Sequence, residues 1–202
     1  MKSKTQERKP AEVRRFEILH AAKELFTKRG FFSVSMDEVA AKVGISKAAV
    51  YLYFKSKTEL FLGMVHQGID KLFSEMESVF LDPANDTFEK KLRAANKAQQ
   101  KYAPIFKTTQ ELLNTGLPDG EFPPKIVSEF MRNIHVRRER ILELLTNLFA
   151  QAQRQGEVRD DLSARELARV FGVYGMLMSR SEISYETARE ILFSGILAKK
   201  DK

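Results

Sequence analysis

The chain has 202 residues, a formal net charge of +7 and no cysteine. Its length suits one domain or two with a sizeable core, and the absence of cysteine from the sequence excludes disulfides, thiolate catalysis and cysteine-ligated zinc. The basic start MKSKTQERKP is not followed by an apolar run, and no segment reaches the roughly 18 apolar residues of a membrane span. We therefore expect a cytoplasmic protein with no membrane partner.

Positive charge is concentrated in the first part of the chain. Residues 1–60 contain 13 Lys and Arg against 7 Asp and Glu, whereas the other 142 residues contain 21 against 20. A surface that binds phosphate groups needs such a local excess. The basic residues 1–10 could add weak contacts to nucleic acid, although a solvated terminus is the simpler interpretation of them.

Every long segment has helical periodicity, and no window shows the alternation of a strand. We expect an all-α protein of about nine helices, with an N-terminal three-helix DNA-binding domain over residues 1–56. A C-terminal helical domain would occupy residues 57–202. The first helix is expected over residues 11–29, with an apolar face of Ile18, Ala22, Leu25 and Phe26, and Gly30 ends it.

The segment from Ser35 to Ser46 has the features of a helix-turn-helix. Ser35 and Glu38 have the spacing of a capping box, which predicts a helix over residues 36–43. Gly44 can adopt the left-handed conformation that ends such a helix, and Ser46 can cap the next one.

The second helix of this motif, over residues 47–54, is expected to enter the major groove of DNA. Lys47 can donate to a guanine edge or a phosphate, and Ala48 and Ala49 allow close approach and can contact a thymine methyl. Tyr51 and Tyr53 carry hydroxyl groups for phosphates or bases. Just beyond this helix, Ser56 and Glu59 have the spacing of a second capping box. Lys57 follows Ser56, so its ammonium would lie at a helix start, where backbone amides favour a phosphate.

Six further helices are expected. A long one covers residues 57–80, another begins after Asp86 and ends near residue 102 before Pro104, and a short one follows to about residue 113. Residues 114–124 are expected to be an irregular connection. A long helix then runs over about residues 124–155 to Gly156, with Ile126, Phe130, Ile134, Ile141, Leu145 and Leu148 facing inward.

The last two helices, over about residues 163–180 and 184–198, carry the prediction of a homodimer. Ser163 with Glu166 caps the first, and Ser184 is a candidate cap for the second. The first is apolar on more than one face, and Gly172, Gly175 and Gly195 suit the close approach of another helix. Burial within a monomer core is the alternative.

Catalytic and metal-binding patterns were sought and none was identified in the sequence. His20, His66 and His135 lack paired ligand spacing, and the chain has no glycine-rich phosphate loop, nucleophile elbow or paired-carboxylate arrangement. We therefore expect no catalytic residues, no metal site and no cofactor. An enzyme that retains a helix-turn-helix stays a minor alternative.

The stretch from Ile18 to Lys57, ILHAAKELFTKRGFFSVSMDEVAAKVGISKAAVYLYFKSK, resembles the N-terminal domain of the TetR (tetracycline-repressor-like) family of bacterial transcription regulators. It covers about a fifth of the chain. One departure is Leu52, at a position where members often carry a polar or aromatic residue that faces DNA. In the family, the residues that commonly face DNA correspond to Ser35, Ser46, Lys47, Ala48, Ala49, Tyr51, Tyr53 and Lys57.

This resemblance implies a homodimeric, all-helical regulator that binds an inverted repeat of double-stranded DNA, most often a repressor that a small-molecule effector releases. It also implies an effector cavity in the C-terminal domain, for which the sequence offers His66, His135 and one of Arg137 and Arg138, with Arg138 preferred. A solvated basic patch is the simpler interpretation of the two arginines. The alternative function is an architectural or cell-cycle DNA-binding protein of the same fold that has no effector.

Overall fold

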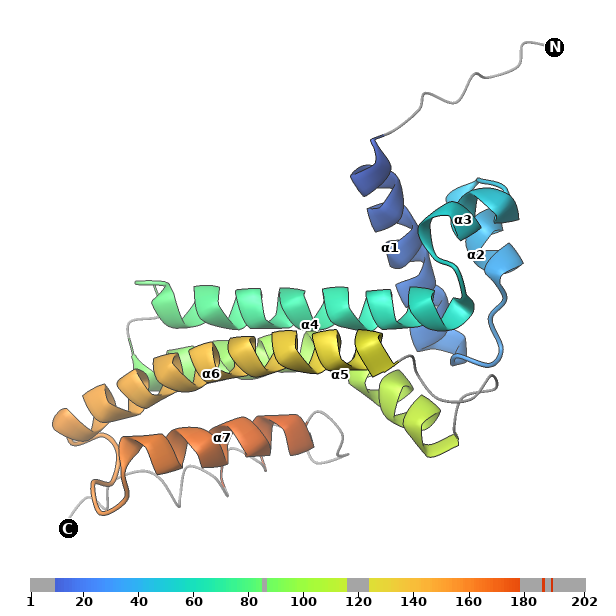
Figure 1. Ribbon diagram of the computed structural model, residues 1–202. Coiled ribbons are helices and arrows are strands. Elements are labelled where there is room, and N and C mark those ends of the chain that lie inside the picture. The colour runs from blue at the N-terminus through green and yellow to red at the C-terminus, as the bar shows by residue number, and fades with distance from the viewer. Residues whose placement is uncertain (1–9, 85–86, 116–123, 179–186, 188–189, 191–202) are drawn as a thin grey trace. The chain divides into compact units, whose positions relative to one another are not determined.

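The computed structural model describes residues 10–84, 87–115, 124–178, 187 and 190. Within these residues the chain is all-α, as predicted, and it forms seven helices (Figure 1). They are α1 (Ala11–Arg29), α2 (Met36–Val43), α3 (Lys47–Tyr53), α4 (Lys57–Leu81), α5 (Phe88–Thr115), α6 (Pro124–Arg154) and α7 (Ala164–Met178). The basic residues 1–9 lie outside the described residues, and so does the helix expected over residues 184–198 apart from residues 187 and 190.

The chain divides into two compact units. The first comprises Met1–Gln67 with Lys107–Gly120, and the second comprises Gly68–Phe106 with Glu121–Lys202. Helices α4 and α5 each supply residues to both units. The domain boundary after residue 56 stays a prediction. Among the described residues, no helix combines the length and the apolar character that crossing a bilayer requires.

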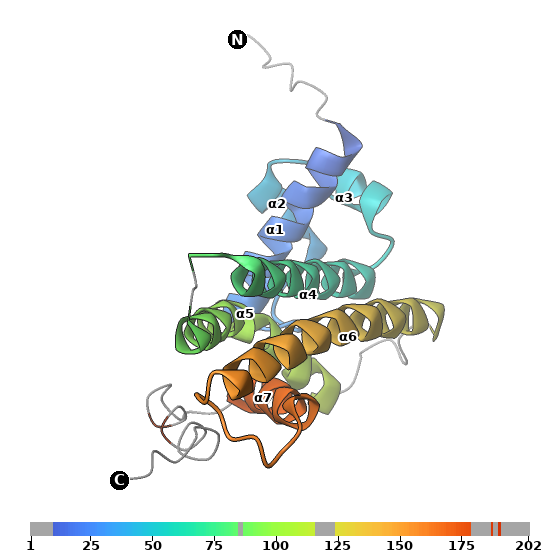
Figure 2. The same ribbon diagram turned by 90° about the vertical axis from the view of Figure 1, so that its left-hand side faces the viewer.

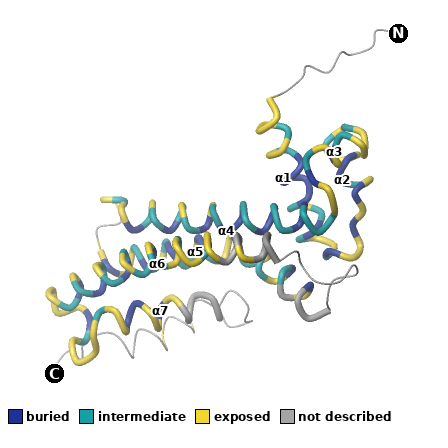
Figure 3. The backbone as a smooth tube through the Cα atoms, in the orientation of Figure 1, coloured by how far each residue is buried: buried dark blue, intermediate teal, exposed yellow. Residues whose placement is uncertain are grey.

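The first unit is built on a core of apolar side chains from its four N-terminal helices. Helix α1 contacts α2, and α2 contacts α3. The rings of Phe26, Phe31 and Phe61 pack against one another, with centroids 5.2 to 5.7 Å apart. Val50 of α3 and Phe54 just after it are fully buried, so α3 is held against the core by one face (Figure 3). The other buried side chains from α1 and α2 include Ile18, Leu19, Ala22, Val39 and Ala40.

The second unit contains α6 and α7, which lie side by side in both views (Figures 1 and 2). The fully buried Phe149 joins them, because its ring contacts Phe171 of α7 at 6.2 Å and Phe88 of α5 at 5.1 Å between centroids. The sequence predicted Ile141, Leu145 and Leu148 as inward residues. Ile141 and Leu145 are buried, but Leu148 is half-buried, so the core stripe continues at Phe149 instead.

The break expected at Pro104 is absent, and this prediction was wrong. Helix α5 runs unbroken through Pro104 for 28 residues. A proline inside a helix removes one backbone hydrogen bond and crowds the preceding turn, and tertiary contacts can offset that cost. Here Tyr102 and Ile105 on either side are buried, and the Tyr102 hydroxyl donates to Glu75 of α4 at 3.0 Å. These contacts hold the helical direction across the proline.

Two helix starts illustrate how local capping sets the element bounds. Helix α5 begins after Thr87, whose hydroxyl accepts from the Lys90 N–H, so the cap lies one residue later than Asp86. Helix α7 begins after Ser163, whose backbone N–H and hydroxyl both donate to Glu166 while the hydroxyl accepts from the Glu166 N–H. The predicted capping box at Ser163 is therefore present.

Candidate nucleic-acid interface

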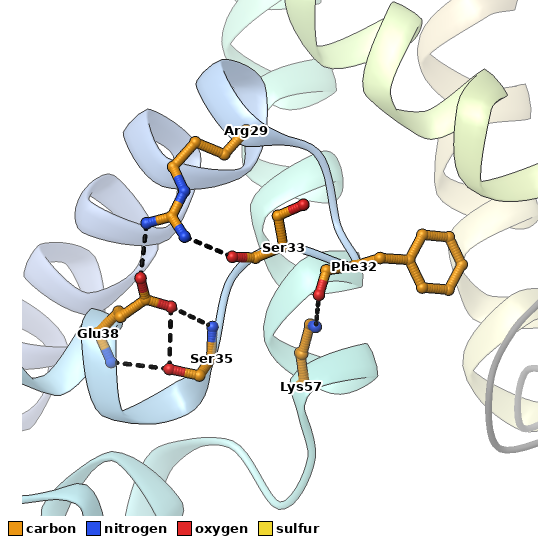
Figure 4. Close-up of polar contacts among 6 residues, drawn as sticks. All are labelled: Arg29, Phe32, Ser33, Ser35, Glu38 and Lys57. Carbon is orange, nitrogen blue, oxygen red and sulfur yellow. Dashed lines mark hydrogen bonds and ion pairs between the residues drawn. The ribbon is translucent and has the colours of Figure 1, made fainter.

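The start of α2 is fixed by the capping box that the sequence predicted. The Ser35 hydroxyl accepts from the Glu38 N–H at 3.2 Å, and the Glu38 carboxylate accepts from the Ser35 N–H at 2.8 Å. Arg29 at the end of α1 adds a second layer, because it donates to Glu38 and to the Ser33 carbonyl, each at 2.6 Å (Figure 4). The backbone N–H of Ser35 and the Arg29 guanidinium together lower the pKa of Glu38 to about 2.

The turn between α2 and α3 has the geometry of a Schellman ending. Gly44 has φ +76°, which favours glycine, and its N–H donates to the Ala41 carbonyl at 3.1 Å. The next N–H, from Ile45, donates to the Ala40 carbonyl at 3.0 Å. Ser46 then caps α3 by accepting from the Ala49 N–H at 3.2 Å. Every backbone step from α2 to α3 is therefore stabilised by short-range hydrogen bonds.

Helix α3 presents one face to solvent. Lys47, Ala48, Tyr51 and Leu52 are exposed, and Ala49 and Tyr53 are half-buried (Figure 3). Because Val50 is buried on the opposite side, the exposed residues cannot rotate inward without emptying the core. The predicted α3 residues Lys47, Ala48 and Tyr51 are therefore accessible to a partner, and the capping residues Ser35 and Ser46 are exposed as well.

Lys47 is paired within the motif. Its ammonium donates to the Asp37 carboxylate at 2.8 Å, so the first turn of α3 is linked to the first turn of α2. The hydrogen bond to Asp37 raises the pKa of Lys47. Both side chains are more than half exposed, so a DNA phosphate or base can compete for the ammonium. Sequence reasoning missed Asp37, because no short-range pattern joins residues ten positions apart.

Lys57 opens α4 in a different setting from the one predicted. Its ammonium lies 4.4 Å from the centroid of the Phe31 ring and donates to the Phe32 carbonyl at 3.4 Å (Figure 4). The Ser56 hydroxyl accepts from the Glu59 N–H, but the Glu59 carboxylate accepts from the Lys55 N–H, one residue before the position that a reciprocal box requires. Lys57 is half-buried, and it connects the start of α4 to the turn after α1.

The residues suggested for an effector site are divided between the chain's two units. His66 is half-buried on the part of α4 that belongs to the first unit. His135 and Arg138 are exposed on α6, in the second unit. The neighbouring Arg137 pairs with Asp70 at 2.7 Å, so its charge is already partly balanced. An effector site at these residues stays a prediction.

Comparisons with known proteins agree with this local geometry. Residues 18–64 match the model of the N-terminal domain of bacterial regulatory proteins of the tetR family. Over 91 residues the chain is 36% identical to the transcriptional activator FasR of Mycolicibacterium smegmatis, an alignment of 45% of this chain and 41% of that protein. The chain thus spans less than half the length of the first curated relatives that it matches.

Two wider matches extend beyond the N-terminal segment. The regulator UidR of Escherichia coli strain K12 is 23% identical over 201 residues, covering 93% of this chain and 94% of that one. The structure of NalD, the secondary repressor of the MexAB-OprM efflux pump of Pseudomonas aeruginosa, superposes with a TM-score of 0.62 at 20% identity over 95% of this chain and all of NalD. That superposition concerns the fold alone. The N-terminal match and the helix-turn-helix geometry identify residues 18–64 as an N-terminal domain of the TetR family of bacterial regulatory proteins.

Proposed function

We propose that this protein is a homodimeric transcription regulator whose two α3 helices occupy successive major grooves of an inverted repeat. Capping at Ser35 and Ser46 and burial of Val50 support this, because they present α3 as a rigid, solvent-facing helix. The positive charge of residues 1–60 supplies the attraction to phosphate that such binding needs. The exposed face of α3 is the observation that carries the proposal.

The contacts with DNA would divide into two kinds. We expect base edges to be contacted by Lys47, Ala48, Ala49 and Tyr51 of α3, and at the margin of that surface by Tyr53. Ser35, Ser46 and Lys57 would contact the phosphate backbone, which sets position without selecting sequence. For Lys47 to contact DNA, its hydrogen bond to Asp37 must give way.

Two residues of α7 support dimerisation through the helices at about residues 163–180 and 184–198. Val170 is an apolar side chain that is 58% exposed. Gly172 lies inside the helix, yet a Cβ at that position would meet no atom of its own chain within 4 Å among the described residues. A mid-helix glycine costs about 1 kcal/mol relative to alanine. A second copy that packs closely against this surface would account for both residues.

A small-molecule effector would act by binding one conformation of the dimer more tightly than another. Helix α4 provides a continuous connection, since its residues 57–67 belong to the first unit and its residues 68–81 to the second. His66, His135 and Arg138 are the effector-contact candidates. FasR is named as an activator and NalD as a repressor. We propose repression by a cytoplasmic protein, with DNA release on effector binding.

Selection of bound duplexes from a random DNA library, with purified protein at near-physiological salt, tests the proposal. Enrichment of an inverted repeat is the expected result, and adding candidate effectors to the bound repeat then tests release. Transcription in vitro from a promoter that contains the repeat separates repression from activation. Salt-sensitive binding that enriches no sequence would instead favour an architectural protein, and absence of binding would contradict the proposal altogether.

A further inference from the structure

Leu52 of α3 is the most exposed of the large apolar side chains that the structure describes, with 76% of its surface accessible. It lies four residues after Ala48, so the two residues share one face of the helix. The opposite face, with Val50 and the following Phe54, is fully buried. The core therefore holds Leu52 outward, on the surface proposed above to enter the major groove.

A leucine side chain has no hydrogen-bonding group, which restricts what it can recognise in DNA. It can bind neither a phosphate oxygen nor the donors and acceptors of the base edges. The major groove offers one apolar group, the C5-methyl of thymine. Lys55, which is exposed just after α3, would add attraction to phosphate.

We propose that Leu52 is a specificity-determining residue that contacts a thymine methyl group in each half-site; this inference rests on the proposed function. The contact would remove apolar surface of both groups from water, which stabilises the complex with thymine relative to any base that lacks the methyl. A polar residue at this position would instead select a base by hydrogen bonding. Leu52 thus gives this chain a base preference of its own.

The spacing on α3 also predicts where this thymine lies. Side chains four residues apart on a helix have Cβ atoms about 5–6 Å apart. Successive base pairs are separated by about 3.4 Å along the duplex. The base pair that Leu52 contacts should therefore lie one or two steps from the base pair that Ala48 contacts.

Replacement of thymidine by deoxyuridine removes only the methyl group, so it tests the contact directly. In the inverted repeat enriched from the library, each thymidine is replaced in turn, at equivalent places in both half-sites, and affinity is measured for the wild type and for Leu52→Ala. At one position, the wild type is expected to lose affinity by about fourfold per half-site, the effect of about one buried methyl group. At that position, the replacement should leave the affinity of Leu52→Ala unchanged. At every other thymidine, it should change the affinity of Leu52→Ala as much as that of the wild type.

Leu81→Ala is the matched control, because Leu81 is an exposed leucine, 59% accessible, at the end of α4. It should respond to every uridine substitution as the wild type does. Equal responses of wild type and Leu52→Ala at every position would overturn the inference, as would a selected half-site without thymine. Failure of the proposed function would be seen earlier and separately, as a library selection that enriches no sequence.

Discussion

The carboxylate of Asp37 lies 2.8 Å from the ammonium of Lys47, and this ion pair joins the first turns of the two helices of the helix-turn-helix. The pair places a negative charge on the surface that we propose to face DNA. A carboxylate there repels phosphate, and it also competes with a base edge for the Lys47 ammonium. Asp37 should therefore weaken DNA binding while it orients Lys47.

Asp37→Asn should strengthen binding to duplex DNA by a few-fold and make the dependence on salt steeper, since it removes a negative charge that repels phosphate and releases Lys47 for its base contact. Titration of labelled duplexes at several salt concentrations measures both quantities. Asp161→Asn, which removes an exposed carboxylate paired with Arg159 in the second unit, is the control and should change neither. Unchanged binding by Asp37→Asn would mean that Lys47 does not contact DNA.

Lys57 and Lys47 should affect binding in different ways. Lys57→Ala is expected to weaken binding to all duplexes alike and to reduce the salt slope by about one unit, because it removes one phosphate contact. Lys47→Ala should relax the preference at one base position. Library selection repeated with each variant distinguishes them.

The Lys57 side chain also contacts Phe31 and Phe32, so Lys57→Ala removes contacts within the fold as well. A loss of folding stability must therefore be distinguished from the loss of a phosphate contact. Thermal unfolding of Lys57→Ala, measured in parallel, shows whether the fold is affected. If both lysine variants reduced binding to every sequence equally, the assignment of Lys47 to base contact would be wrong.

The low pKa of Glu38 predicts a stability that depends on pH. The Ser35 backbone N–H and Arg29 lower this pKa from 4.5 to about 2, so the folded state favours the ionised carboxylate. The resulting stabilisation is complete above the unfolded pKa, and it is lost as pH falls from about 5 to about 2. In thermal unfolding experiments, the melting temperature of the wild type should therefore fall more steeply over this pH range than that of Glu38→Gln.

Glu157→Gln, in the turn after α6, is the control for this experiment and should follow the wild-type profile. The remaining slope shared by all three proteins would come from other carboxylates whose pKa is lowered, including Glu24 beside Lys42 and Asp161 beside Arg159. Identical profiles for wild type and Glu38→Gln would show that the capping box adds no pH-dependent stability.

Gly68 of α4 and Ile105 of α5 should be coupled in stability. A Cβ added at Gly68 would lie 2.4 Å from Cδ1 of Ile105, so the isoleucine would have to move. Overpacking of this kind costs about 1–3 kcal/mol of the free energy of unfolding. Alanine in place of glycine inside a helix offsets about 1 kcal/mol of that cost, so we expect Gly68→Ala to destabilise the protein by the difference. Ile105→Val removes Cδ1, so the double variant should be more stable than the sum of the two single changes predicts. Denaturant unfolding of all four proteins measures this coupling, and strict additivity would contradict it.

Val170 should lie in the dimer interface if α7 forms it. Val170→Arg would place a charge on a surface buried between copies, so we expect it to shift the protein toward monomer and to weaken binding to the inverted repeat. Leu81→Arg is the control, since Leu81 is equally exposed but lies at the end of α4. Sedimentation at several concentrations measures the oligomeric state. A Val170→Arg protein that stays dimeric would place the interface elsewhere.

Short-range features of the chain determined most helix bounds in advance. The predicted start of α2 at Ser35, the turn at Gly44 and the start of α7 after Ser163 agree with the structure, because each depends on hydrogen bonds between residues no more than five positions apart. The same local pattern supported the comparison with the TetR family over residues 18–64.

Other features were decided by contacts between residues far apart in sequence. The passage of α5 through Pro104 depends on burial of Tyr102 and Ile105 against α4, whereas local rules favour a break at that proline. Asp37 reaches Lys47 across a turn, and Lys57 reaches Phe32 from 25 positions away. Within the described residues, the sequence by itself thus determined most of the helical segments and where the helix-turn-helix lies. Only the tertiary structure decided which side chains those helices pair, bury or leave exposed, because burial depends on distant neighbours that no local pattern specifies.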